Sequence, residues 1–202
     1  MIEIKDKKDC VGCTACTEIC PKKCNQMKPD EERFLYPVVD KSGCVECNAC
    51  NTVCPIQSSV TEEEKPQKAY LVQHSDEKVR LDSSAGGAFT AIATVVLQKG
   101  GVVFGAAYDE NFHVQHTYVE TVDELKKFRN SKYVQSELGD SFHIVKDFLR
   151  KGRWVCFSGM PCQIEGLSKF LRKTYEKLML VDVVCHGIPS PLIWNKYLEY
   201  QK

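Results

Sequence analysis

The pattern of apolar and polar positions divides the chain into two parts. Before residue 55, apolar residues are sparse, and the extended stretch 34–39 (Phe-Leu-Tyr-Pro-Val-Val) predicts one arm of a small hairpin. Beyond residue 69, short apolar runs alternate with segments of helical periodicity, which indicates an α/β layer fold. Strands are expected at 69–73, 102–107, 114–119, 154–157 and 178–184, and helices at 87–97, 122–128, 138–149, 163–171 and 191–200.

Two of these segments carry a clear pattern of burial. The run 178–184 is nearly all apolar, which is typical of a strand covered on both faces. In 138–149 the apolar residues fall four, three and four apart, on one face of a helix. They are Leu138, Phe142, Val145 and Leu149.

A polar, acidic segment between residues 57 and 67 separates the two parts, as a linker does. We therefore expect a small cysteine-rich domain at 1–57, a linker at 58–68 and an α/β domain at 69–202.

Composition and charge exclude several classes of protein. The 27 basic and 27 acidic residues balance, so no net positive charge attracts nucleic acid or an anionic membrane. The charged start (Met-Ile-Glu-Ile-Lys-Asp-Lys-Lys) lacks the apolar core of a secretory signal. The longest uncharged run, 83–98, has 16 residues, whereas a membrane span needs about 20 apolar ones. We therefore expect a cytoplasmic chain that binds no nucleic acid and spans no membrane.

Cysteine is the unusual residue of this chain, with 12 in all and nine before residue 55. In a cytoplasmic protein such thiols serve metal binding or redox chemistry. The run Cys-x-x-Cys-x-x-Cys-x-x-x-Cys-Pro occurs twice, from Cys10 to Pro21 and, 34 positions later, from Cys44 to Pro55. This is the spacing of bacterial two-cluster ferredoxins, in which the fourth cysteine of each run binds the other cluster.

The repeat predicts two 4Fe–4S clusters with crossed ligands, whose binding also supplies folding free energy to a small domain. The first set is Cys10, Cys13, Cys16 and Cys54, and the second is Cys20, Cys44, Cys47 and Cys50. Zinc is the alternative, because paired Cys-x-x-Cys elements also bind it. Eight evenly doubled cysteines, with proline after each fourth, fit iron–sulfur clusters far better.

Cys24, Cys156 and four of the histidines carry no ligand pattern. Cys24 lies outside the repeat and Cys156 lies in an apolar strand, so each is expected to be a small buried side chain. Scattered histidines are expected to be solvated or hydrogen-bonded at the surface. They are His74, His113, His116 and His143.

Three turns of small residues, at 83–90, 157–163 and 184–190, each lead into a predicted helix. Ligands of open α/β sheets bind outside the carboxyl ends of the strands. Helix N-termini there favour phosphate, such as the pyrophosphate of a flavin dinucleotide. Each of the three turns alone is explained as a glycine turn. The three together indicate a ligand site.

Several segments resemble the coenzyme F420 hydrogenase/dehydrogenase beta-subunit family. They are Asn-Ser-Lys-Tyr-Val-Gln-Ser at 130–136, Phe-Ser-Gly-Met-Pro-Cys-Gln-Ile at 157–164, Val-Asp-Val-Val-Cys-His-Gly-Ile-Pro-Ser at 181–190, and Ser-Ser-Ala-Gly-Gly at 83–87. Many bacterial members carry a two-cluster ferredoxin module in front of this domain. The expected fold class is therefore α+β, with a small two-cluster ferredoxin-like domain followed by a flavin-binding-like α/β domain. Because family members usually continue beyond the Cys-His-Gly motif, we expect the second domain to be incomplete.

The resemblance also implies cofactor sites. Its flavin site, expected to hold FAD, falls on Ser84, Gly86, Gly87, Lys132 and Gly159. Family members often have a further Cys-x-x-Cys downstream, which makes Cys162 and Cys185 candidate ligands of an incomplete third cluster. No catalytic residue is assigned.

The implied function is that of an iron–sulfur flavoprotein oxidoreductase. Electrons would pass between 4Fe–4S clusters and a flavin, and on to a hydride or electron acceptor such as a deazaflavin. The expected partner is a low-potential electron donor or acceptor protein, or a redox enzyme subunit. The alternative is a non-catalytic ferredoxin-type electron carrier whose second domain docks a partner enzyme. A third hypothesis is a catalytic thiol at Cys162, or at Cys185 beside His186. This hypothesis has less support, because no third orienting group is identifiable.

Overall fold

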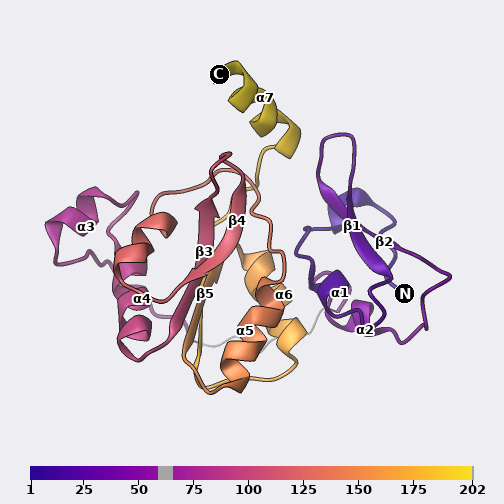
Figure 1. The fold of residues 1–202 in the computed structure, drawn as a ribbon, viewed down its shortest axis with the longest axis horizontal. Helices are drawn as coiled ribbons and strands as arrows, with labels where there is room; N and C mark the ends of the chain where they lie inside the picture. The colour runs from indigo at the N-terminus through magenta and orange to yellow at the C-terminus, as the bar shows by residue number, and fades with distance from the viewer. Residues whose placement is uncertain (59–65, 202) are drawn as a thin grey trace.

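A mixed four-stranded sheet organises the second part of the chain (Figure 1). The computed structural model describes residues 1–58 and 66–201. The strand order is β4-β3-β5-β6. β3 (Val102–Tyr108) pairs antiparallel with β4 (Val114–Val119) and parallel with β5 (Val155–Gly159), which pairs parallel with β6 (Leu178–Asp182). The carboxyl ends of three parallel strands therefore meet at one edge.

Helices cover both faces of this sheet. On one face, α4 (Ala88–Gln98) and the 3-10 helix η2 (Asp123–Phe128) pack in a cluster that includes Val103 and Cys156. On the other, α5 (Ser141–Arg150) and α6 (Pro161–Leu171) pack over Phe104 and Phe157. The helix face predicted from Leu138 to Leu149 is buried in that second cluster. α3 (Glu77–Leu81) and α7 (Pro191–Gln201) have no buried residues.

The cysteine-rich part is a small module of short elements. β1 (Asn25–Pro29) and β2 (Leu35–Val39) form an antiparallel hairpin, which includes the arm predicted at 34–39. The 3-10 helix η1 (Lys7–Asp9) and two one-turn helices, α1 (Ala15–Glu18) and α2 (Ala49–Thr52), complete the module. The expected fold class, a small two-cluster ferredoxin-type domain followed by an α/β domain, is confirmed.

The module and the α/β domain share a hydrophobic core. Cys13, Ala15 and Val53 from the module belong to the same buried cluster as Phe142 of α5 and Leu167 of α6. Figure 1 shows α5 and α6 between the sheet and the module. The two helices therefore form the surface on which the module docks.

Two local expectations are wrong. Residues 69–73 are irregular, with Leu71 fully exposed, because no neighbouring strand in the described residues supplies the hydrogen bonds that a strand needs. The run 178–184 is not covered on both faces, since no residue of β6 is fully buried and Val184 beyond it is 86% exposed. The helix expected at 122–128 does form, as the 3-10 helix η2.

Of the linker expected at 58–68, residues 59–65 lie outside the described residues. No helix in 1–58 or 66–201 combines the length and the apolarity needed to cross a membrane.

Candidate metal centres and redox site

The first cysteine set lines one cavity. Its four cysteines come from the loop after η1, from α1 and from the segment that follows α2. They are Cys10, Cys13, Cys16 and Cys54. Gly12 and Thr14 adopt left-handed backbone conformations, which wrap the loop around the cavity. The remaining lining is largely aliphatic, including Ile2, Ile4 and Val11.

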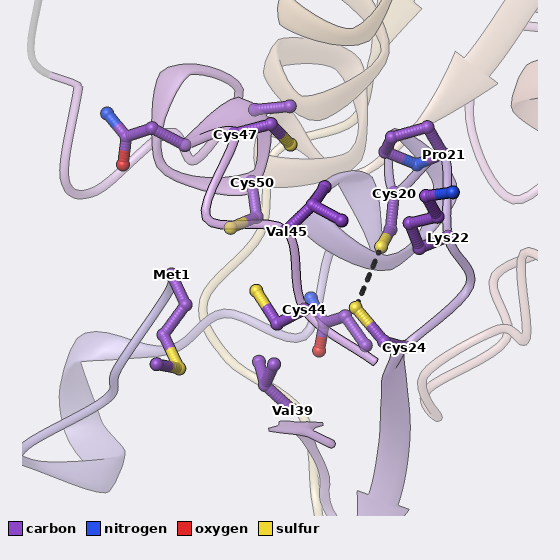
Figure 2. Close-up of a pocket in the computed structure, with 13 residues that line it drawn as sticks. Met1, Cys20, Pro21, Lys22, Cys24, Val39, Cys44, Val45, Cys47 and Cys50 are labelled. Carbon is purple, nitrogen blue, oxygen red and sulfur yellow. Dashed lines mark hydrogen bonds between the residues drawn. The ribbon is translucent and has the colours of Figure 1, made fainter. Parts of the chain in front are cut away.

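The second cysteine set lines a separate cavity (Figure 2). Its lining includes the four cysteines expected from the repeat, Cys20, Cys44, Cys47 and Cys50. Each cavity thus receives three cysteines from one run and the fourth from the other run. This is the crossed arrangement that two-cluster ferredoxins use.

The second cavity also contains Cys24. Its sulfur lies 3.5 Å from the Cys20 sulfur, and the side chain is partly exposed. The expectation of a buried apolar side chain is therefore wrong for Cys24. For Cys156, which is fully buried in β5, burial agrees with the expectation.

The residues at both cavities fit iron–sulfur clusters. Each donor set consists of four thiols, which are the ligands of 4Fe–4S clusters. In the described residues the thiols do not converge closely enough on one point to hold a single metal ion. The Ile2 amide donates to the Cys50 sulfur at 3.2 Å, and such N–H···S contacts tune the potentials of bound clusters.

The two cavities differ in exposure. Cys13, Cys16 and Cys54 are 7–8% exposed, whereas Cys47 is exposed and its neighbour Val45 is 57% exposed. Burial raises the thiol pKa of Cys13 and Cys16 to about 12, so metal binding must displace their protons. Cys10 of the first set is partly exposed, as are Cys20, Cys44 and Cys50 of the second. The first set is therefore the more buried of the two, and the second reaches the surface at Cys47.

Helix α6 lies directly against the first set. A Cβ atom at Gly166 would lie 3.3 Å from both the Cβ and the Sγ of Cys13, and 3.5 Å from the Cβ of Ala15. Glycine in a helix interior costs about 1 kcal/mol relative to alanine. Gly166 is therefore explained by the close approach of the Cys13 loop to α6.

Polar contacts hold the same interface on either side. The Gln135 amide donates to the carbonyls of Val11 at 3.5 Å and Gly12 at 3.4 Å. The Lys169 ammonium donates to the Ser58 hydroxyl at 2.9 Å. A ring nitrogen of His143, Nε2, lies 3.0 Å from the carbonyl of Glu18 in α1.

Cys162 and Cys185 lie near the carboxyl edge of the sheet. Cys162 is the second residue of α6, directly after β5, and Cys185 follows β6. The Cys185 sulfur lies 3.9 Å from the Met160 sulfur, at the start of α6. Because β5 and β6 are parallel, the two cysteines leave the sheet on the same side.

A buried polar chain fixes the turn at this edge. The Met160 amide donates to the Gln163 side-chain oxygen at 2.9 Å, and the Gln163 amide donates to the Ser136 hydroxyl at 3.1 Å. Ser136 and His116 Nδ1 lie 2.9 Å apart, and His116 Nε2 lies 2.9 Å from the Ser158 carbonyl. A neutral ring with its proton on Nε2 satisfies every partner.

The surface position expected for His116 is wrong, because the side chain is 8% exposed. Burial lowers the pKa of His116 to about 4, which keeps the ring neutral at physiological pH. The alternation of side chains along β4 could have predicted this burial, since His116 lies on the same side of the strand as buried Val114.

The residues expected at the flavin site fall into two groups. Ser84 donates to the Asn130 side chain at 3.1 Å and accepts from the Ser131 amide at 3.3 Å, which brings it near Lys132. Gly86 and Gly87 continue from Ser84 into α4, and Gly87 takes the left-handed conformation there.

Gly159 belongs to the second group, at the end of β5. A Cβ atom there would lie 2.9 Å from the Gln163 side-chain oxygen and 3.4 Å from His116 Nε2. Its small size is therefore required by the buried polar chain.

Lys132 is half-buried. Its ammonium donates to the carbonyls of Arg129 at 2.8 Å and Lys127 at 3.0 Å. Burial lowers the Lys132 pKa to about 8. Two of its three N–H donors are thus used within the fold.

Comparison with known proteins first defines the class. Residues 9–58 match the family model of the 4Fe-4S dicluster domain, so the chain is an iron–sulfur protein. Residues 69–142 match the N-terminal model of the coenzyme F420 hydrogenase/dehydrogenase beta subunit, and residues 152–202 match its C-terminal model. The chain therefore belongs to the coenzyme F420 hydrogenase/dehydrogenase beta-subunit family, which confirms the resemblance.

Two relatives extend this comparison. A coenzyme F420-dependent sulfite reductase of Methanocaldococcus jannaschii is 28% identical over 205 residues, or 97% of this chain. The F420-reducing [NiFe] hydrogenase complex from Methanosarcina barkeri shares the fold at a TM-score of 0.52 and 20% identity, over 63% of this chain. The matched region is 30% of the sulfite reductase and 47% of the hydrogenase chain.

Proposed function

We propose that this chain is an iron–sulfur electron-transfer unit of a flavin-dependent oxidoreductase. One observation carries the proposal: the first cysteine set is packed against α6 of the α/β domain, while the second reaches the surface at Cys47. A simple carrier has no need to bury one of its clusters against another domain. A chain that connects a partner to a site in its own second domain needs this arrangement.

The chain's residues have distinct tasks in this proposal. Cys10, Cys13, Cys16 and Cys54 hold the inner cluster, and Cys20, Cys44, Cys47 and Cys50 hold the outer one. When bound, clusters supply one-electron transfer, and a flavin couples single electrons to a two-electron hydride step. Gly166 allows close approach at the inner set. Exposed residues such as Cys47 and Val45 leave the outer set accessible to a redox partner protein.

FAD at the second domain is part of the proposal. Supporting it, Ser84, Gly86 and Gly87 lead into the N-terminus of α4, where the helix dipole favours phosphate. Lys132 directly follows Ser131, whose amide donates to the Ser84 hydroxyl. Gly159 keeps the β5–α6 turn compact. Cys162 and Cys185 are proposed ligands of a third, incomplete cluster.

The names of the relatives suggest the acceptor. Both act with coenzyme F420 by their printed names, and we extend this to propose a deazaflavin as the hydride partner. The chain would then work with a redox enzyme subunit. The competing function is a ferredoxin-type carrier whose α/β domain only docks an enzyme.

Anaerobic reconstitution tests the two functions. With two 4Fe–4S clusters, the protein should contain about eight iron atoms per chain. Titration with FAD should add resolved absorption bands that are released on denaturation, and FMN serves as the comparison. Iron-loaded protein that binds no flavin at any concentration refutes the flavoenzyme and favours the carrier. A value near twelve iron atoms, lowered by Cys185→Ser, means that the third cluster site is complete.

A further inference from the structure

The same backbone turn occurs in both cysteine runs, between the second and the third cysteine. Thr14 of the first run has φ of 59°, and Asn48 at the equivalent position of the second run has φ of 60°. Because the two residues differ and the conformation does not, the turn is set by the way each loop wraps its cavity. The residue at this position must therefore accept a left-handed backbone.

The two residues accept this conformation unequally. Asparagine is among the residues that tolerate left-handed backbone, whereas a β-branched residue is an outlier there. Strained residues of this kind persist where the surrounding structure fixes them, and they cluster at functional sites. Backbone preference therefore does not explain why a threonine occupies position 14.

The side chains at the two positions also differ in their contacts. Oδ1 of Asn48 accepts from the side-chain amide of Asn51 at 2.5 Å. The hydroxyl oxygen of Thr14 is buried and has no hydrogen-bond partner among residues 1–58 and 66–201. It does not cap α1 either, although threonine at a helix start usually accepts from a backbone amide. Since a buried hydroxyl without a partner is unfavourable, a further group is expected beside it.

Thr14 lines the inner cavity, together with the four cysteines of the first set. Apart from these cysteines, the polar side chains among the lining residues are those of Thr14 and Asp9. An ionised carboxylate only accepts hydrogen bonds, whereas a hydroxyl can donate one. Thr14 is therefore the lining side chain that can donate to the sulfur atoms of a cluster held in this cavity.

We propose that the Thr14 hydroxyl donates a hydrogen bond to a sulfur of the inner cluster and thereby raises its reduction potential. The inference rests on the two-cluster function proposed above. A reduced cluster carries one more negative charge than an oxidised one, and a hydrogen bond to the more negative acceptor is stronger. The hydroxyl therefore stabilises the reduced form, as hydrogen bonds to cluster sulfurs do. A raised potential favours electron transfer from the outer cluster to the inner one, beside α6.

EPR-monitored redox titration of the cluster-loaded full chain tests this proposal. Thr14→Val removes the hydroxyl and keeps the β-branched shape, whereas Thr14→Ser keeps the hydroxyl. Thr52→Val is the matched control, because Thr52 belongs to the same module and lines neither cavity. In Thr14→Val one of the two potentials should fall, with up to about tenfold less reduced cluster at a fixed potential, or about 59 mV. Thr14→Ser and Thr52→Val should keep both potentials of the wild type.

Pulsed ENDOR of the reduced protein in H2O and in D2O identifies the hydrogen bond directly. The coupling of one exchangeable proton should be present in the wild type and in Thr14→Ser, and absent from Thr14→Val. Thr14→Gly is the second variant, because it removes the hydroxyl and the backbone strain together. It should show the same lowered potential as Thr14→Val but a higher midpoint of denaturation, which a purely structural role of the hydroxyl would not give.

Two results would overturn the hydrogen bond to the inner cluster. One is wild-type potentials in Thr14→Val and Thr14→Gly with the exchangeable coupling retained, and the other is an equal fall of both potentials. Each leaves the proposed function standing if the wild type holds about eight iron atoms. A wild type with far less iron overturns the two-cluster function and the hydrogen bond together.

Discussion

Valine at Gly166 tests the contact between the inner cysteine set and α6. A Cβ at this position would already lie 3.3 Å from the Cβ and Sγ of Cys13 and 3.5 Å from the Cβ of Ala15. The two approaches to Cys13 are tight, whereas the one to Ala15 is an ordinary contact. The two methyl groups of valine add volume where all three residues are buried. Cys13 cannot give way freely when its sulfur is bound to a cluster.

The expected magnitude follows from two opposing effects. Replacing glycine by valine in a helix interior raises helix propensity, which stabilises the fold by about 0.5 kcal/mol. Overpacking a buried contact costs about 1–3 kcal/mol. We therefore expect Gly166→Val to lower the free energy of unfolding by about 1–2 kcal/mol. Because the Cys13 loop must shift, the reduction potential of the inner cluster should change and that of the outer cluster should not.

Ser168→Val supplies the matched control, since Ser168 is exposed on the same helix. Stability is measured by anaerobic urea denaturation of the cluster-loaded protein, and potentials by EPR-monitored redox titration. If Gly166→Val matches Ser168→Val in stability and in both potentials, the close docking of the inner set on α6 is wrong.

Three further predictions concern the sheet edge. His116 has a folded-state pKa depressed from 6.5 to about 4, so its contribution to stability is complete above pH 6.5 and is lost as pH falls toward 4, by up to about 3 kcal/mol. Anaerobic denaturation of His116→Asn should show a flatter pH dependence, and an unchanged slope refutes this. Lys132→Ala should weaken FAD binding at unchanged iron content, and equal affinity in the exposed control Lys126→Ala and in Lys132→Ala would return Lys132 to a purely structural role. Gly159→Ala should cost about 1–3 kcal/mol by pushing against Gln163, and a neutral effect on the denaturation midpoint contradicts the packing described.

Elements with a strong local pattern could be predicted from the sequence. The strands at 102–107 and 114–119 have continuous or alternating apolar residues, and β3 and β4 form there. The helix over 138–149 was predicted from its apolar face, although it begins later, at Ser141. The cysteine spacing indicated which residues gather around each cavity, because the spacing itself reflects the geometry of a cluster.

Features that depend on distant partners could not be predicted in the same way. Residues 69–73 have a strand-like composition, but a strand forms only beside another strand. The apolar run at 178–184 suggested burial, whereas the sheet order leaves β6 at an edge. The place of Cys24 beside Cys20 could not be predicted, because the turn that brings them together depends on the left-handed conformation of Lys23. The buried chain from His116 to Met160 joins three separate segments, which no local pattern describes.

Alkylation mapping of cluster-loaded Cys54→Ala tests the central claim most directly, because it asks which cysteines share a cluster. The crossed arrangement predicts that loss of Cys54 makes Cys10, Cys13 and Cys16 reactive toward iodoacetamide, while Cys44, Cys47 and Cys50 stay protected. The opposite map, with Cys44, Cys47 and Cys50 reactive and the first three protected, would contradict the crossed ligand sets and the assignment of the inner cluster to the α6 interface.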